Sequence, residues 1–282
     1  MKIISGKELS DKLKKNMAVE TATFESHFGR LPKLAVILVG NDAGSVSYVT
    51  GKAKACAEVG ILNETIRYEE TISENELLQK IAELNADTTT DGILVQLPLP
   101  KHINEKTVIS AIKQEKDVDG FHPLNTAALW SKTDCILPCT PKGIIKLLKS
   151  ENIEIAGKNA VVIGRSNIVG LPVSKLLLDE NATVTIAHSR TKNLAEVAAN
   201  ADILVVAIGR PKFVTAEMVK NGAVVIDVGV NRDLETGKLC GDVDFDAVAE
   251  KTSFITKVPG GIGPMTICCL IENTIECFLR KM

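Results

Sequence analysis

The sequence has 282 residues, of which 45% are hydrophobic and 24% are charged, the range of ordinary soluble globular proteins. This length predicts one or two domains. The formal net charge of −2 and the low aromatic content of 4% argue against a nucleic-acid-binding surface, because such a surface needs basic groups that displace counterions and rings that stack on bases. Small anionic ligands are not excluded, since a local cluster of Lys and Arg is enough to bind them.

The seven cysteines contain no C-x-x-C pair, so we interpret them as reduced, buried thiols of a reducing compartment and expect no metal site. The N-terminal sequence MKIISGKELSDKLKK lacks the apolar core of a signal peptide. We also find no uninterrupted apolar run of the roughly 18 residues that cross a bilayer. We therefore expect a cytoplasmic protein that binds neither membrane nor nucleic acid.

In the first half, short runs rich in Val and Ile alternate with helical patterns, which is typical of a parallel α/β domain. Strands are predicted at 33–39, 64–68 and 92–97, and helices at 7–27, 45–59 and 74–86. Right-handed crossovers would stack these helices on a small parallel sheet.

A denser series of strands follows Pro138. A helix is predicted at 141–148, strands at 160–163, 183–186, 203–206 and 223–226, and a last apolar helix at 265–278. The spacing of about twenty residues between these strands fits the βα units of a nucleotide-binding sheet.

We predict a two-domain α/β fold on this basis. Residues 1–139 form an α/β substrate domain, and residues 140–265 form a Rossmann-type NADP-binding domain. The last helix, 266–282, is expected to pack back on the first domain.

The clearest motif is Gly164-Arg165-Ser166-Asn167-Ile168-Val169-Gly170, which lies between a predicted strand and a predicted helix. A dinucleotide pyrophosphate can meet backbone N–H groups and the helix dipole at such a place. The spacing is not G-x-G-x-x-G, because Ser166 stands where the second glycine would be, and a tight packing turn is the alternative interpretation.

The next strand ends in Ile186-Ala187-His188-Ser189-Arg190-Thr191, without the carboxylate that NAD-preferring folds place there. Arg165, Ser189 and Arg190 can supply positive charge and hydrogen bonds to a 2′-phosphate, so NADP is predicted over NAD. A solvated turn is the alternative. We place His188 with this group, although by itself it is more simply a turn histidine than a catalytic one.

Three further residues follow the third and fourth strands of this series, namely Gly209, Asp227 and Gly229. Glycines at the carboxyl ends of parallel strands allow a nucleotide to approach the backbone closely. We therefore assign all three to the predicted cofactor site.

On the substrate side, Tyr48 and Lys52 lie four residues apart on one face of a predicted helix, where a phenol and an ammonium can face a ligand. From spacing alone, an ordinary solvated lysine is the simpler interpretation. Gln96 is the one polar residue of its apolar strand. A buried glutamine needs partners, and either a lysine or a purely structural group can serve.

Asp117 and Asp119 alternate in Lys116-Asp117-Val118-Asp119-Gly120, so in extended chain they point to opposite sides. We expect one to face a ligand and the other to cap or turn, rather than a catalytic carboxylate pair. The loop Pro259-Gly260-Gly261-Ile262-Gly263-Pro264 is poor in side chains. It either lets a flat ligand approach the backbone or makes a turn into the last helix.

Together these residues resemble the bifunctional methylenetetrahydrofolate dehydrogenase/methenyltetrahydrofolate cyclohydrolase family over essentially the whole chain. The matching segments follow the order of the family: Tyr48-x3-Lys52, Val95-Gln96-Leu97-Pro98-Leu99-Pro100, Lys116-Asp117-Val118-Asp119-Gly120, Pro138-Cys139-Thr140-Pro141-Lys142-Gly143, Gly164-Arg165-Ser166-x-Ile168-Val169-Gly170-x-Pro172 and Pro259-Gly260-Gly261-x-Gly263-Pro264-Met265-Thr266.

The resemblance implies a folate site between the two domains. It makes Lys52 the principal catalytic residue of the hydrolytic step, positioned by Gln96, with Asp119 hydrogen-bonded to the pterin ring. Tyr48 would lie against the folate, and Pro259, Gly260 and Gly261 would line its site. The resemblance also implies a homodimer formed through the cofactor domain, and contacts from Arg165 and Ser189 to the 2′-phosphate of NADP.

The chain departs from the family where Asp42-Ala43-Gly44-Ser45 replaces the usual Asp-Pro-Ala-Ser, and we expect a looser entry into the helix there. Smaller departures occur at Ala127 and Lys257. Two rival functions are another two-domain NADP enzyme, such as a shikimate dehydrogenase, and a nucleotide-binding sensor that has lost turnover. The presence of Lys52, Gln96 and Asp119 argues against the second.

Overall fold

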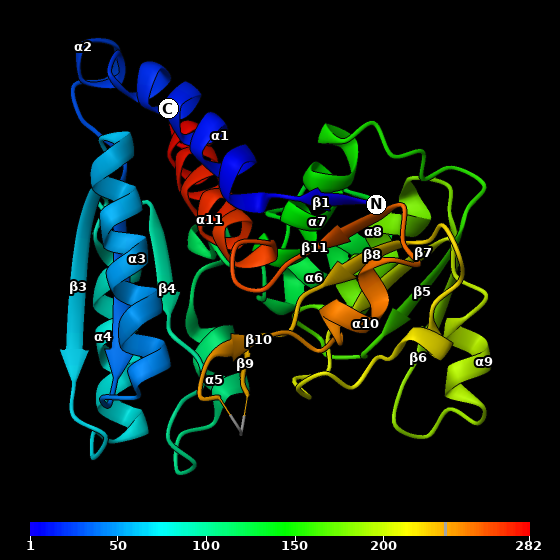
Figure 1. Ribbon diagram of the computed structural model, residues 1–282. Helices are drawn as coiled ribbons and strands as arrows, with labels where there is room; N and C mark the ends of the chain where they lie inside the picture. Colours follow the sequence, from blue (N-terminus) through cyan, green and yellow to red (C-terminus); the bar gives the residue numbers. More distant parts are fainter. Residues whose placement is uncertain (234–235) are drawn as a thin grey trace. The chain divides into compact units, whose positions relative to one another are not determined.

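The computed structural model describes residues 1–233 and 236–282. The chain divides into two compact units, each built as an α/β layer structure (Figure 1). We call Lys12–Cys139 with Ile267–Met282 the first unit, and Met1–Asp11 with Thr140–Thr266 the second unit.

The first unit is built on a parallel sheet of order β3-β2-β4. Its strands are β2 (Lys33–Val39), β3 (Leu62–Tyr68) and β4 (Gly92–Val95), linked by α3 (Ala43–Val59) and α4 (Glu74–Ala86). After Lys33, every residue of β2 is buried, as expected for a central strand that is covered on both faces. On one of these faces, Ala35, Ile37 and Val39 share a core with apolar residues of α4.

The other helices of the first unit are shorter or cross its boundary: α1 (Gly6–Thr21), α2 (Phe24–Phe28), α5 (Glu105–Ala111), the 3-10 turn η1 (Gln114–Lys116), α6 (Pro123–Ser131) and α11 (Ile262–Leu279). The single helix predicted at 7–27 is wrong, because two helices, α1 and α2, occupy these residues. Thr21 and Thr23 donate their hydroxyls to the backbone oxygens of Val59 and Glu20, and such side-chain bonds compete with the helical ladder.

The last helix, α11, packs back on the first unit, as predicted. Its Phe278 stacks on Phe24, with ring centroids 5.3 Å apart. We found no span-length apolar run in the sequence, yet over the described residues α11 alone is long and apolar enough to cross a membrane. With 61% of that window buried inside the protein, its apolar character is accounted for by core packing.

The second unit contains a parallel sheet of order β1-β11-β8-β7-β5-β6, typical of a nucleotide-binding fold. Its strands are β1 (Lys2–Ile4), β5 (Asn159–Ile163), β6 (Thr183–Ala187), β7 (Ile203–Val206), β8 (Val224–Asp227) and β11 (Phe254–Thr256). Its remaining elements are α7 (Cys139–Ser150), α8 (Gly170–Asp179), α9 (Leu194–Ala198), η2 (Ala216–Met218), α10 (Phe245–Ala249) and the antiparallel pair β9 (Asn231–Arg232) and β10 (Leu239–Cys240).

The two units differ from the predicted domain division at the N-terminus. Residues 1–11, expected with the first domain, group with the second unit. The reason is that β1 pairs in parallel with β11, joining Lys2 to Phe254 and Ile4 to Thr256. The N-terminal strand thereby satisfies its backbone groups at the edge of the second sheet.

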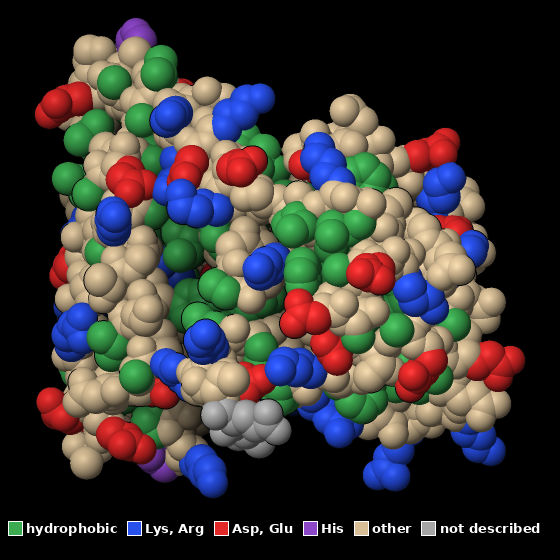
Figure 2. Space-filling view, viewed as in Figure 1, with side chains coloured by type: hydrophobic (Ala, Val, Ile, Leu, Met, Phe, Trp, Pro, Cys, Tyr) green, Lys and Arg blue, Asp and Glu red, His purple; other side chains and the backbone are tan. Residues whose placement is uncertain are grey.

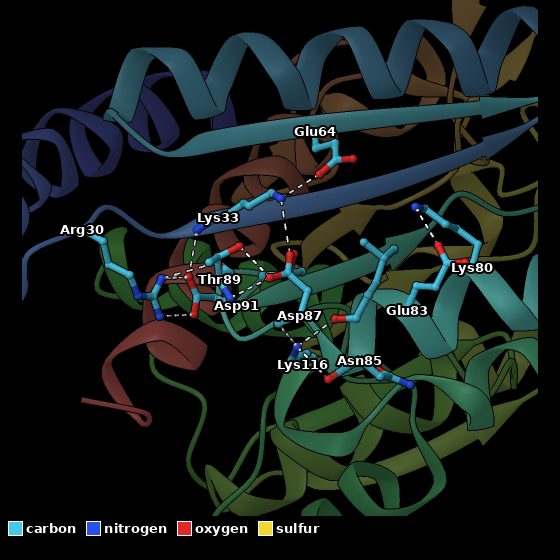
Figure 3. A network of polar contacts seen from close by, with 12 residues as sticks. Arg30, Lys33, Glu64, Lys80, Glu83, Asn85, Asp87, Thr89, Asp91 and Lys116 are labelled. Carbon is cyan, nitrogen blue, oxygen red and sulfur yellow. Dashed lines mark hydrogen bonds and ion pairs between the residues drawn. The ribbon is translucent and has the colours of Figure 1, made fainter.

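Opposite charges hold the first unit together near the start of β2 (Figure 3). The Asp91 carboxylate, with no exposed side-chain surface, accepts hydrogen bonds of 2.7 and 2.8 Å from the two terminal nitrogens of Arg30. It also accepts from the backbone N–H of Lys33 and from the ammonium of Lys281, which follows α11. A buried carboxylate that is paired and hydrogen-bonded in this way anchors both ends of the unit.

Charged side chains of both signs are interspersed over each unit on the face shown in Figure 2. This mixture agrees with the formal net charge of −2. A surface of mixed sign gives a weak field at long range, so binding of a charged ligand depends on local groups.

Candidate active site

Lys52 lies in the third turn of α3 and is buried, with 6% of the residue exposed. Its ammonium donates a 2.9 Å hydrogen bond to Gln96 Oε1. The helix is capped by Asp42, whose side chain accepts from the Ser45 N–H at 2.8 Å, so the Ala43-Gly44 departure leaves a capped helix entry. Lys52 is therefore not the solvated helix lysine that spacing alone suggested.

Gln96 comes directly after β4 and is held at both its backbone and its side chain. Its backbone N–H donates to the oxygen of Ile37 in the central strand, and its side-chain nitrogen donates to the Leu97 oxygen at 2.7 Å. With the amide nitrogen engaged, Oε1 is left to face Lys52. The glutamine thus fixes the position of the ammonium.

The residues one helical turn before and after Lys52 on α3 carry a phenol and a thiol. Tyr48, one turn before it, is half-buried, and this burial raises the pKa of the phenol. Cys56, one turn after it, is buried, and burial raises the pKa of the thiol to about 12. Both groups therefore remain protonated near neutral pH, and neither neutralises the ammonium.

Asp119 supplies the carboxyl group of the site. Burial raises its pKa to about 6, although the positive charge of Lys52 and the nearby Cys139 thiol both oppose the rise. At neutral pH the group is ionised and acts as a hydrogen-bond acceptor. The structure therefore places Lys52, Gln96 and Asp119 within one electrostatic neighbourhood of the first unit.

Asp117, two residues earlier, has the structural role. It is buried, and its carboxylate accepts from the His122 backbone N–H at 2.7 Å and from Asn125 Nδ2 at 2.9 Å. These bonds form the turn into α6. The two carboxylates thus differ in role, one turning the chain and the other lying near Lys52, as expected from their alternation.

The loop between β5 and α8 in the second unit is closely packed around its two glycines. A Cβ on Gly164, whose φ is +129°, would lie 2.3 Å from the Ala207 oxygen. A Cβ on Gly170 would lie 2.3 Å from the Gly164 oxygen. Ser166 Oγ accepts from the backbone N–H groups of Val169 and Gly170, which closes the loop without a second glycine.

Arg165, Ser189 and Arg190 are exposed at the ends of neighbouring strands. Strands β5 and β6 pair up to Ile163 and Ala187, and the Gly164 N–H donates to the Ala187 oxygen at 2.9 Å. The exposed cationic and hydroxyl groups consequently project from adjacent loops at one edge of the sheet, where a parallel sheet binds nucleotides.

His188 has a local role in the same turn. Its Nδ1 accepts from the Arg190 backbone N–H at 3.1 Å, and the backbone N–H of His188 donates to the Thr191 hydroxyl. The imidazole therefore orders the loop that carries Ser189 and Arg190. Direct contact of its side chain with a cofactor stays a prediction.

Two buried carboxylates, Asp227 and Asp242, organise the loops after β7 and β8. The sequence pointed to Asp227 but not to Asp242. Asp242 has no exposed surface and accepts from the N–H groups of Ile208, Gly209 and Arg210 and from Asn231 Nδ2. Asp227 accepts from the N–H groups of Gly229, Asp242 and Val243, and burial raises its pKa to about 6. The Asp227 carboxylate thus accepts hydrogen bonds from three backbone N–H groups.

Gly229 lies directly against the Asp242 side chain. A Cβ on Gly229 would lie 2.2 Å from Asp242 Cγ, so only glycine fits beside that carboxylate. Gly209, with φ of +64°, has open space around the site of a Cβ. The two glycines assigned to the cofactor site therefore differ, one being required by packing and the other by backbone conformation.

Pro259, Gly260 and Gly261 belong to the second unit. The Gly260 oxygen accepts from the Lys7 N–H at 3.1 Å, and a Cβ on Gly6 would lie 1.8 Å from the Gly261 oxygen. This loop packs closely on the start of α1, which supports its interpretation as a turn. Contact between these residues and a substrate stays a prediction.

Two buried residues beside the Lys52 group were also missed. Cys139 donates to the Val118 oxygen, and Asn273 on α11 donates to the oxygens of Val118 and Leu137. Asn273 did not carry the signal that identified Gln96, because it lies between the polar residues Glu272 and Thr274 and does not stand out from them. Its partners lie more than a hundred residues away, so the sequence did not show what it holds.

Comparisons with known proteins give matches over nearly the whole chain. The catalytic domain of the tetrahydrofolate dehydrogenase/cyclohydrolase family matches residues 4–119, and the NAD(P)-binding domain of that family matches residues 138–282. A bifunctional protein FolD from Bacillus anthracis is 57% identical over 278 residues, which cover 99% of this chain and 96% of that protein.

Solved structures give the same result. The bifunctional enzyme FolD from Campylobacter jejuni is 47% identical, with a TM-score of 0.97 and complete coverage of both chains. A Trypanosoma brucei FolD solved with NADP and an inhibitor is 38% identical, with a TM-score of 0.95, covering 99% of this chain and 97% of that one. A shikimate dehydrogenase from Aquifex aeolicus, at 16% identity and a TM-score of 0.51, shares the fold alone.

Proposed function

This chain belongs to the tetrahydrofolate dehydrogenase/cyclohydrolase family, and we propose that it catalyses two consecutive reactions of a one-carbon folate. The first is the NADP-dependent oxidation of 5,10-methylenetetrahydrofolate to 5,10-methenyltetrahydrofolate. The second is the hydrolysis of that product to 10-formyltetrahydrofolate. The observation that carries the proposal is the buried Lys52–Gln96 pair beside Asp119, within the part of the chain that matches the catalytic domain of the family.

In the hydrolytic step, water adds to the methenyl carbon, which lies between N5 and N10 of the folate. The water loses both of its protons over the reaction: one is released to solvent as the water adds, and the second is balanced by protonation of N5 as the bond from N5 to this carbon breaks, leaving the formyl group on N10. An ammonium carries three N–H donors, and Gln96 accepts from one of them. Lys52 is therefore placed to hydrogen-bond the oxygen of the adding water and to assist its proton transfer.

Asp119 and Tyr48 would bind the pterin. Because the pKa of Asp119 is about 6, its carboxylate accepts hydrogen bonds at neutral pH, and the N–H groups of a pterin ring are suitable donors. Tyr48, on the same face of α3 as Lys52, would lie against the ring. We propose further that Pro259, Gly260 and Gly261 contact the folate, as the family resemblance implies.

The second unit fits an NADP molecule. The closely packed Gly164–Gly170 loop joins β5 to the start of α8, and exposed Arg165, Ser189 and Arg190 provide cationic and hydroxyl groups for a 2′-phosphate. Bound NADP supplies the hydride acceptor of the oxidation. The residues of this chain hold and orient it, with Asp227 and Asp242 keeping the adjacent loops in place.

We also propose a cytoplasmic homodimer that pairs through the second unit. The proposal rests on the resemblance to the family, and on seven free cysteines of the kind that persist in a reducing compartment. Light scattering coupled to size-exclusion chromatography tests the dimer. A single mass near 30.3 kDa at micromolar concentration would contradict it.

Parallel spectrophotometric assays test the enzymatic proposal. The purified full chain is given 5,10-methylenetetrahydrofolate with NADP+ or with NAD+, and separately 5,10-methenyltetrahydrofolate with no nucleotide. We expect NADPH formation that exceeds NADH formation, and loss of the methenyl absorbance without nucleotide. Thermal stabilisation by these ligands with no turnover would instead indicate a sensor, and turnover of shikimate alone would indicate the rival dehydrogenase.

A further inference from the structure

Asp119 ends a short run, residues 116–119, and each of the three residues before it is held by a different element of the first unit. Lys116 comes first. It is 4% exposed, and its ammonium donates to the oxygens of Leu84, Asn85 and Asp87 at 2.8, 3.0 and 2.6 Å (Figure 3). These oxygens lie at the C-terminal end of α4, where a cation is favourable. The start of the run is thereby fixed to α4.

The next residue, Asp117, is fixed to the start of α6 through His122 and Asn125. The side chain of Val118 is fully buried against β4. A Cβ on Gly92 would lie 2.4 Å from Val118 Cγ1, so the valine fills the space that the glycine leaves. The peptide oxygen of Val118, which directly precedes Asp119, is the next group of this run, and it accepts from the Cys139 thiol.

Asn273 holds that oxygen. It is fully buried on α11, and its Nδ2 donates to the Val118 oxygen at 2.8 Å and to the Leu137 oxygen at 2.9 Å. An amide nitrogen carries two hydrogens, and these two bonds use both. The same nitrogen lies 3.5 Å from Sγ of Cys139, whose thiol donates to the Val118 oxygen and lies close enough to Asp119 to lower the pKa of that carboxyl.

We propose that Asn273 is a positioning residue for the reaction: by holding the oxygens of Val118 and Leu137, its amide fixes Asp119 opposite Lys52. The inference rests on the proposed function of Asp119. It assigns a role in the active site to the C-terminal helix, through a residue outside every sequence segment that carries the family resemblance. Asn273 itself touches backbone and a thiol, so it acts on the substrate only through Asp119.

A double-mutant cycle separates positioning from general stability. Asn273→Ala and Asp119→Ala are made singly and together in the full chain, and kcat/KM for hydrolysis of 5,10-methenyltetrahydrofolate is measured for each. We expect Asn273→Ala to lower kcat/KM by about 10- to 100-fold, the effect of misplacing a catalytic group by about an ångström. In the Asp119→Ala background the same change should lower it by less than about 2-fold, because no carboxylate remains to be placed.

Two additional variants keep the test decisive. Thr274→Val is the matched control, because Thr274 is the next residue on α11, is fully buried, and donates only within the helix, to Leu270. It should lower thermal stability with less than about a 2-fold effect on kcat/KM. Asn273→Ser keeps one donor and serves if the alanine variant does not fold. Its kcat/KM should fall between those of the alanine variant and the unaltered protein.

Each remaining outcome has a definite meaning. An equal loss in both backgrounds, or an equal loss for Thr274→Val, would show that Asn273 acts through stability and would overturn the inference. Normal kcat/KM for Asn273→Ala beside a damaged Asp119→Ala would overturn the inference and leave the proposed function standing. Normal kcat/KM for Asp119→Ala would remove the proposed function of Asp119, and the role of Asn273 with it.

Discussion

The ammonium of Lys52 and the side-chain oxygen of Gln96 lie 2.9 Å apart, joining the third turn of α3 to the end of β4. Gln96 is itself held by Ile37 and Leu97, so the contact fixes a buried cation at one position. An ammonium carries three N–H donors, and the contact with Gln96 uses one of them, so the others can bind a ligand. This relationship gives the most direct test of the proposed hydrolysis.

Replacement of Lys52 by alanine should abolish most of the hydrolytic activity. If Lys52 assists proton transfer at the adding water, Lys52→Ala should lower the rate of hydrolysis by roughly 100- to 10,000-fold. The measurement is the decay of methenyl absorbance under single-turnover conditions. Lys54→Ala, at an exposed position of the same helix, is the matched control. Near-normal hydrolysis by Lys52→Ala would refute the assignment.

Asp119 should destabilise the folded chain at neutral pH. Its pKa rises from 3.8 in the ordinary state to about 6 in the fold, so the folded state binds this proton more tightly and stability falls as the pH rises from about 4 to 6. Asp119→Asn removes the penalty. At about 1.4 kcal/mol per pKa unit, discounted for a half-buried group, we expect a gain of about 1–2 kcal/mol at pH 7.5.

Urea unfolding at pH 4.5 and 7.5 measures this effect. The gain from Asp119→Asn should be smaller at pH 4.5, where the carboxyl of the unaltered protein is already protonated in the fold. Glu69→Gln, at an exposed position, is the control for the removal of one carboxylate. If Asp119→Asn raised the free energy of unfolding more at pH 4.5 than at pH 7.5, the fold would stabilise the ionised form of Asp119 and the prediction would fail.

Arg165 should determine the preference for NADP over NAD. A hydrogen bond to a charged group contributes about 1.5–3 kcal/mol, so Arg165→Ala should weaken NADP+ binding by about 10- to 100-fold and leave NAD+ binding nearly unchanged. Isothermal titration with both nucleotides measures this. Arg67→Ala, at an exposed position of the first unit, is the control. Equal weakening of both nucleotides would place Arg165 away from the 2′-phosphate.

Gly170 should tolerate no side chain. A Cβ there would lie 2.3, 2.6 and 2.9 Å from the O and C atoms of Gly164 and the N of Arg165, all backbone atoms. Gly170→Ala should therefore widen the loop, lower the free energy of unfolding by about 1–3 kcal/mol and greatly weaken NADP+ binding. Nucleotide-independent hydrolysis by the first unit should be much less affected.

Gly157→Ala is the matched control for this change. Gly157 has φ of +73° and open space around a Cβ, so its replacement costs about 1–2 kcal/mol of backbone strain without a steric clash. Both variants are compared by urea unfolding and by titration with NADP+. Normal NADP+ binding by Gly170→Ala would mean that the loop can move aside and does not require a glycine at this position.

Local patterns predicted the regular parts of the fold well. The strands 33–39 and 203–206 are found at those residues, because central strands buried on both faces are apolar along their whole length. The helix 74–86 is also found as predicted, because the Ser73-to-Glu76 capping box marks its start. Strand β1 was missed, since a three-residue strand has little periodicity and its partner, β11, lies 252 residues away in the register of Lys2 with Phe254.

The sequence by itself determined the two α/β units, the glycine loop between β5 and α8, and the residues that we propose to bind folate and NADP, because periodicity, glycine spacing and motif order are local properties of the chain. Only the tertiary structure decided that Lys52 is buried, that Asp117 turns the chain while Asp119 lies near the ammonium, and that Asn273 holds the segment between them. Burial and pKa depend on which distant segments exclude water from a side chain, and those contacts leave no mark at the residue itself.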